Sequence, residues 1–111
     1  MVQYIKEKNM LYKVEAKFHK EKMAEFFTAL TDDSIFKQEP DGSTMVKAMQ
    51  TAIMIEDNTL VWYEHCFCST PLKHERETVY DKYFYDFKTI LVDEVKDDIV
   101  GDYFWEYLKE A

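Results

Sequence analysis

Apolar and charged residues alternate without a break over residues 10–18. One set contains Tyr12, Val14, Ala16 and Phe18, and the other contains Lys13, Glu15 and Lys17. Successive side chains of a strand point to opposite faces of its sheet, so this pattern predicts a half-buried strand. The charged set is expected on the open face of the sheet.

Two helices are predicted next. Residues 20–31 carry apolar side chains at positions i, i+3, i+4 and i+7, namely Met23, Phe26, Phe27 and Leu30, which is the spacing of an amphipathic helix. Residues 32–42 are expected to form a loop that Pro40-Asp41-Gly42 closes. Residues 43–51 fit a short helix or an extension of the following strand. We favour the helix, with Ser43 as its N-cap.

A hairpin follows. Residues 52–55 and 60–68 have the composition of two strands, and Glu56-Asp57-Asn58-Thr59 is a turn between them.

The residue pattern of the C-terminal third predicts a helix, then a strand, then a second helix. Thr70 and Pro71 suit the cap and first position of a helix that runs to about Lys88. Residues 89–92 predict the last strand. After Gly101, Asp102 can cap a final helix, whose aromatic cluster is expected to dock on its own domain or on a partner.

This order of elements predicts a single α+β domain over residues 1–111. The simplest arrangement is ferredoxin-like: a four-stranded antiparallel sheet with β-α-β-β-α-β order, helices on one face, and an additional C-terminal helix.

Composition narrows the class of protein. Apolar residues make up 47% of the chain and aromatic residues 16%, which is typical of a packed domain. The formal net charge of -8 disfavours binding to the negatively charged phosphate backbone of nucleic acids, so no nucleic-acid partner is expected. The chain has no apolar run long enough for a membrane span and no apolar leader at its start. We therefore expect a protein of the reducing cytoplasm that does not bind membranes.

Cys66 and Cys68 are the two residues of this chain that suggest metal or redox chemistry, together with His65 and His74. Strand alternation places both cysteines on one face and His65 on the other, so the four groups would not converge on a metal. The same alternation keeps His65 from activating a cysteine nucleophile. In a strand the cysteine Cα atoms would lie roughly 6.6 Å apart, which is unfavourable for a disulfide. We expect reduced cysteines that face the helices, and no metal or cofactor.

Arg76 is the single arginine of the chain, and it falls between Leu72 and Val79 on the apolar stripe of a predicted helix. A buried arginine needs a charged partner, because it stays protonated. Placing Leu60, Trp62, Glu64, Cys66 and Cys68 on the core face would bring Glu64 beneath the helix. We therefore predict a direct Glu64–Arg76 contact.

That pair can be interpreted in two ways. It can be a structural ion pair, which is the interpretation we favour. Alternatively, Glu64 and Arg76 line a pocket with the nearby Tyr80 and Tyr83 and bind a small polar or anionic molecule. In the first interpretation, Tyr80 and Tyr83 belong to the apolar stripe of the helix and are ordinary core residues.

The same choice of face places Tyr63, His65 and Phe67 on the open side of the sheet. Large rings on an uncovered sheet favour a partner, and a second copy of the chain is the simplest one. The sequence thus predicts a homodimeric, non-catalytic binding or assembly module. The alternative is a small enzyme or small-molecule binder with its site at Glu64 and Arg76.

Overall fold

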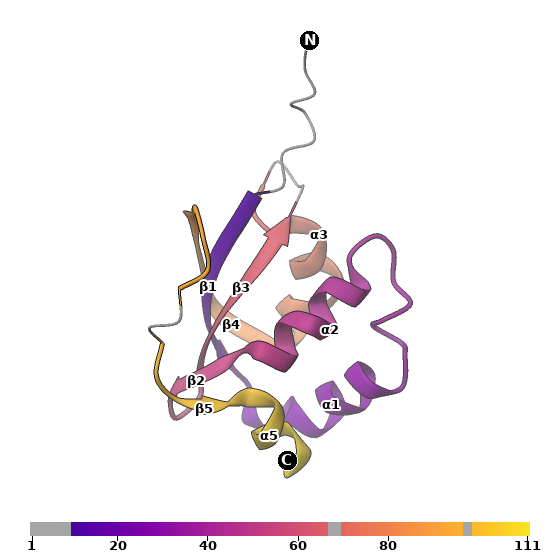
Figure 1. The fold of residues 1–111 in the computed structure, drawn as a ribbon. Helices are drawn as coiled ribbons and strands as arrows, with labels where there is room; N and C mark the ends of the chain where they lie inside the picture. The colour runs from indigo at the N-terminus through magenta and orange to yellow at the C-terminus, as the bar shows by residue number, and fades with distance from the viewer. Residues whose placement is uncertain (1–9, 67–69, 97–98) are drawn as a thin grey trace.

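A five-stranded antiparallel sheet forms the centre of a computed structural model that describes residues 10–66, 70–96 and 99–111 (Figure 1). The strand order is β4-β1-β3-β2-β5. The strands are β1 (Met10–Phe18), β2 (Ile53–Glu56), β3 (Thr59–Cys66), β4 (Phe84–Val92) and β5 (Asp102–Tyr103).

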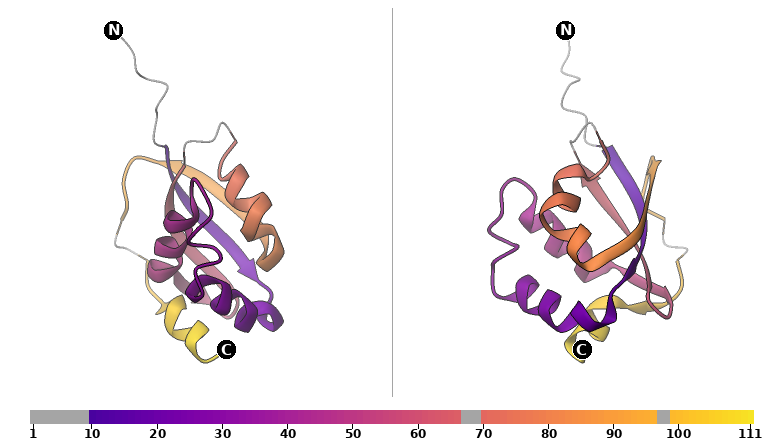
Figure 2. Two further views of the ribbon diagram at one scale, coloured as in Figure 1. Left: turned by 90° about the vertical axis from the view of Figure 1, so that its right-hand side faces the viewer. Right: turned by 180° about the vertical axis from the view of Figure 1, so that it is seen from behind.

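The helices gather on one face of this sheet (Figure 2). They are α1 (Met23–Thr31), which follows the 3-10 turn η2 (Lys20–Lys22), α2 (Gly42–Thr51), α3 (Lys73–Glu75), α4 (Asp81–Tyr83) and α5 (Phe104–Lys109). A π-turn, η3 (Arg76–Tyr80), joins α3 to α4. The fold is therefore α+β, with the helices on one side of an antiparallel sheet, as the sequence predicts at that level.

The core lies between the sheet and the helices. The apolar residues of β1 that were predicted to face inward are all buried there. They pack with an aromatic cluster in which Phe26, Trp62 and Phe84 come from α1, β3 and β4. Full burial of each such side chain contributes roughly 1.5–3 kcal/mol, so this cluster holds helices and sheet together.

Several local predictions are confirmed. The helix over 20–31 appears as η2 and α1, and residues 43–51 are helical within α2. The hairpin is formed by β2 and β3. The two predicted caps of later helices are wrong: Leu72, with a left-handed φ of 52°, precedes α3, and Tyr103 precedes α5.

The helix predicted to reach Lys88 ends at Tyr83. Residues from Phe84 onward belong to β4, where Phe84 pairs with Phe18 and both rings enter the core. Asp86 has a φ of 50°, next to a shift in the β1–β4 register that marks a bulge. The strand is thus longer than the predicted residues 89–92.

The sheet also has a strand more than expected. Asp102 and Tyr103 pair with Met54 and Ile53 of β2 before the chain enters α5. Gly101 permits this approach, because a Cβ at that position would overlap the carbonyl oxygen of Met54.

The face without helices is called the open face below. Directly opposed residues of antiparallel strands share a face, so the register defines its members. In β1, β3 and β4 they are Leu11, Lys13, Glu15 and Lys17 of β1, Thr59, Val61, Tyr63 and His65 of β3, and Tyr85, Lys88, Ile90 and Val92 of β4.

Candidate functional site

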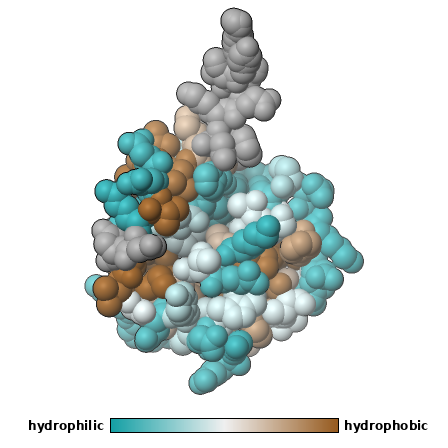
Figure 3. Space-filling model, in the orientation of Figure 1, coloured by the Kyte–Doolittle hydropathy of each residue, from teal (hydrophilic) through white to brown (hydrophobic). Residues whose placement is uncertain are grey.

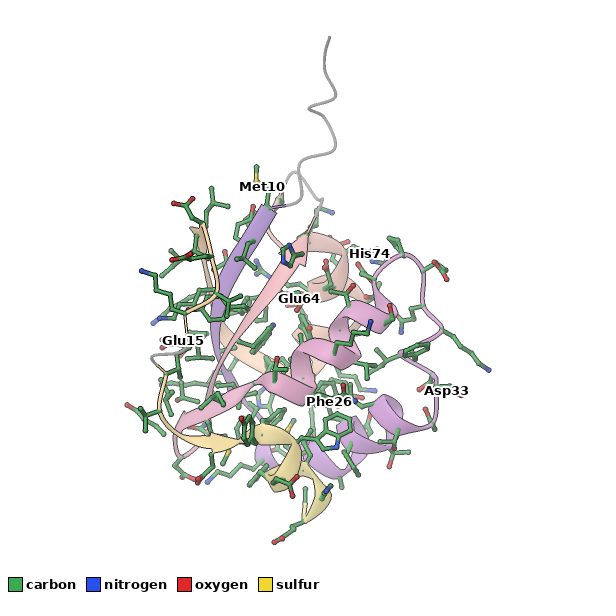
Figure 4. The ribbon with its side chains drawn as sticks, viewed as in Figure 1. Met10, Glu15, Phe26, Asp33, Glu64 and His74 are labelled. Atoms are coloured by element: carbon green, nitrogen blue, oxygen red, sulfur yellow. The ribbon has the colours of Figure 1, made fainter. Side chains whose placement is uncertain are left out.

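Glu64 is the most unusual polar residue of the core. It lies on β3 with its side chain toward the helices, and 2% of the residue is exposed (Figure 4). Its Oε1 accepts hydrogen bonds from Trp62 Nε1 at 2.9 Å and from the Tyr80 hydroxyl at 2.7 Å. If the group is a carboxylate, its Oε2 has no donor among the described residues. An unsatisfied buried carboxylate oxygen is costly, which favours a proton on this group.

The π-turn η3 brings two further groups to Glu64. The amide of Asp81 donates to the carbonyl of Arg76, five residues earlier. This wide turn directs both Glu75 and Tyr80 into the core, although they are five residues apart, and their exposures are 1% and 0%. Isolated π-turns inside helices are often found at functional sites.

Three carboxyl groups form a connected chain at this point. The Glu75 carboxyl interacts electrostatically with Glu64 on one side and with Asp41 on the other. Asp41 Oδ2 lies 2.7 Å from His74 Nδ1, and the His74 side chain is 39% exposed. We call Glu64, Glu75 and Asp41 the carboxyl chain. Neighbouring buried carboxyl groups repel each other when both are ionised, so this cluster favours the protonated form of its most buried members.

The pKa shifts in the carboxyl chain agree with that geometry. Burial raises the pKa of Glu64 to about 8, although hydrogen bonds from Tyr80 and Trp62 oppose the rise. Burial and the neighbouring Asp41 charge also raise the pKa of Glu75. The pKa of Tyr80 lies well above its usual value, first because of burial and then because of Glu64. Burial therefore favours the protonated form of Glu64, and at the other end of the carboxyl chain His74 contacts Asp41 at the surface.

Arg76 does not contact Glu64, so that prediction is wrong. The Arg76 side chain is 38% exposed, and its Nε lies 3.9 Å from Asp81 Oδ1. Its guanidinium also lies over the Phe87 ring, 5.1 Å from the ring centroid. The π-turn changes the facing of this segment, so that Glu75 points inward and Arg76 points to the rim.

Replacement of Arg76 by alanine is therefore expected to have a small effect. A partly exposed ion pair contributes roughly 0–1 kcal/mol, and an exposed cation–π contact contributes about 0.5–1 kcal/mol. Urea unfolding of Arg76→Ala should show a loss below about 2 kcal/mol. Arg76→Lys provides the comparison, because it keeps the charge. A loss of about 3–5 kcal/mol for Arg76→Ala, typical of breaking a buried pair, would contradict this account.

Tyr83 is also separate from Glu64. Its hydroxyl donates to Glu25 Oε2 at 3.0 Å, and Lys82 pairs with the same carboxylate. These groups line a surface groove of about 520 Å³ beside α1. Of the four residues predicted to form a ligand site, the structure brings Glu64 and Tyr80 together and places Arg76 and Tyr83 elsewhere.

Sequence reasoning missed Glu75 as a neighbour of Glu64, and it missed Asp41 and His74, which follow Glu75 in the cluster. Glu75 could have been found, because it lies three residues after Leu72 and four before Val79, on the same helical stripe. Asp41 had no such signal, since it follows a proline in what the sequence marks as a turn.

The predicted facing of the cysteines toward the helices is confirmed for Cys66. Cys66 is buried on the helix-facing side of β3, and its Sγ lies 3.9 Å from Glu75 Oε1. Cys68 lies outside the described residues. Within the described ranges, no group of three or more His, Cys, Asp or Glu side chains is arranged to hold a metal ion.

The open face carries two of the three residues predicted to form an interface. Tyr63 is half-buried and His65 is exposed, while Phe67 lies outside the described residues. The chain between β4 and β5 passes from one edge of the sheet to the other. A groove of about 600 Å³ lies along this path, and its lining includes Ile53, Val61, Tyr63, Val95, Ile99 and Tyr103.

Comparison with family models, curated proteins and solved structures gives no match for this chain. In the part of the chain that the structure describes, no helix has the length and apolar character needed to cross a membrane.

Proposed function

We propose that this protein is a non-catalytic binding and assembly module that acts as a homodimer in the cytoplasm. Its exposed apolar surface carries the proposal. Six large hydrophobic side chains are exposed on β4, on the connection that follows it and on β5, namely Tyr85, Ile90, Leu91, Val95, Val100 and Tyr103. Figure 3 shows hydrophobic residues gathered on the side where β4 ends and the connection descends. Concentrated apolar surface of this kind marks interaction sites in proteins.

The alternative function, a small enzyme or a binder of anionic molecules at Glu64 and Arg76, has weaker support. Arg76 would have supplied the positive charge of that site, but it lies at the rim beside Asp81. The charged neighbour of Glu64 is Glu75, whose own neighbour is Asp41, and ionised carboxyls repel an anion.

The arrangement of strands also supports the finer fold assignment. The order β4-β1-β3-β2, with every neighbouring pair antiparallel, is what a ferredoxin-like sheet requires. We propose that β5 extends such a sheet beside β2. An experimental structure that includes all the residues would test this assignment.

Light scattering tests the homodimer. The expected mass at micromolar concentration is twice the chain mass of 13.4 kDa, and dilution should shift it toward the chain mass. The exposed apolar side chains provide the reason, since association removes them from water. A mass near 13.4 kDa across the accessible concentration range would reject the homodimer.

A further inference from the structure

The strand β3 extends beyond its neighbour β2. Pairing with β2 ends at Val61, and among the described residues no strand pairs with this edge of β3 over residues 62–65. Figure 1 shows the long β3 continuing past the short β2, with α2 beside it. Successive residues of a strand direct their main-chain groups to alternate edges, so two residues of this stretch present N–H and C=O groups there. We call residues 62–65 on this side the free edge of β3.

A groove lies between the free edge and α2. It has a volume of about 290 Å³, and its lining includes Lys47 and Thr51 of α2 and residues 63–65 of β3. Thr51 and Tyr63 also line the groove of about 600 Å³ that begins at Val61. The two grooves therefore meet and follow the free edge from an apolar end to a polar end.

The charge of the polar end is opposite to that of the whole chain. Lys47 and His65 are exposed, and their side chains have no ion-pair or hydrogen-bond partner in the part of the chain that the structure describes. Glu64 also lines the groove, but burial raises its pKa and so favours its neutral form. On a chain with a formal net charge of -8, this end of the groove is suited to a carboxylate of an occupant.

We infer that the free edge of β3 binds an extended acidic peptide of a partner protein, which adds a strand to the sheet beside α2. Main-chain hydrogen bonds hold such a peptide in other complexes formed by strand addition. Lys47 and His65 receive its acidic side chain, and the surface at Val61 receives an apolar one. The inference rests on the proposed binding module and names what the module binds. It does not require the homodimer.

The unpaired main chain favours a peptide over a small molecule. A small molecule that fills the groove leaves the main-chain groups of the free edge to water. An extended peptide has N–H and C=O groups at the strand spacing of about 3.3 Å per residue, so about four of its residues lie along residues 62–65. Its alternate side chains then point into the groove and away from it.

Titration of the full chain with peptides of about seven residues tests the inference. The first peptide alternates glutamate and valine, the second alternates lysine and valine, and the third is the first with every amide N-methylated. The first should shift the backbone NMR signals of residues 62–65 and of α2, and the other two should bind at least about tenfold more weakly. The absence of shifts at millimolar peptide, or equal binding of the N-methylated peptide, would overturn strand addition.

Lys47→Glu tests the polar end of the groove. Reversal of this charge should weaken binding of the acidic peptide about tenfold and strengthen binding of the lysine peptide. Lys37→Glu is the matched control, because Lys37 is an exposed lysine outside the lining of the groove and its reversal should leave binding unchanged. Equal weakening by both variants would show attraction to the overall charge only, and would overturn the site.

Hydrogen exchange of the peptide-free protein shows whether the edge is available. About half of the amides from 62 to 65 should exchange rapidly, because they point away from β1. Protection of all of them would overturn the inference, and its dependence on protein concentration would distinguish a second copy from a segment of the same chain. Light scattering on the same samples separates the two proposals. A monomer that binds the acidic peptide would reject the homodimer alone, and a dimer that does not bind it would reject the peptide site alone.

Discussion

Raising the pH from 5 to 9 is expected to destabilise the folded protein by several kcal/mol. Glu64 has a pKa of about 8 in the fold and 4.5 as a reference for the unfolded chain, so the folded state binds its proton more tightly. The stabilisation from this proton is fully present when the pH is below the pKa of Glu64 in the unfolded chain. It is lost as the pH rises through the pKa of Glu64 in the folded protein. Between those limits one proton gives a slope of about 1.4 kcal/mol per pH unit. Urea unfolding at a series of pH values measures this slope.

The raised pKa of Glu75 acts in the same direction, since burial also disfavours its ionised form. Tyr80 does not contribute in this range, because its pKa is raised well above its usual value. Glu25, Asp32 and Glu77 have lowered pKa values, which would make stability increase with pH. These groups are exposed, so their effect is small. The carboxyl chain therefore sets the sign of the expected dependence.

Glu64→Gln is the control for this prediction. Its amide oxygen can accept from Trp62 and Tyr80, and its NH₂ group can donate to Glu75 as a protonated Glu64 would. The variant should have a shallower slope, and it should be more stable than the wild type at pH 9. An unfolding free energy of the wild type that stays level from pH 5 to 9 would show that the carboxyl chain holds no proton.

The boundary between α4 and β4 shows what hydrophobic patterns leave undecided. Tyr80, Tyr83, Phe84 and Phe87 satisfy helical spacing, and Phe84 is also buried as a strand residue opposite Phe18. No glycine or proline lies near the boundary between Tyr83 and Phe84 to mark the change from helix to strand. By contrast, residues 10–18 and 20–31 each have a single periodicity, and both elements were predicted correctly.

The carboxyl chain could be predicted in part. The need of Arg76 for a carboxylate partner placed Glu64 under the helical segment, and that placement is correct although the Glu64–Arg76 pair does not form. Its partner depended on the phase of residues 72–80, and Glu75 and Arg76 are both compatible with the stripe of a regular helix. The π-turn decides between them, and a sequence pattern tuned to regular helices carries no signal for it. Asp41 reaches the site through tertiary folding of a loop, which local patterns do not describe.

Replacing Phe104 by alanine is expected to cost roughly 3–5 kcal/mol, because the buried ring leaves a cavity. Phe104 is fully buried and packs against Phe18, with ring centroids 5.3 Å apart. Its amide also donates to the carbonyl of Ala52, which fixes α5 on its own domain. Tyr103→Ala is the adjacent control, since Tyr103 is 59% exposed and should cost less than about 1 kcal/mol. Urea unfolding measures the loss of unfolding free energy in each variant. A loss for Phe104→Ala as small as that for Tyr103→Ala would contradict the packing of α5 on this core.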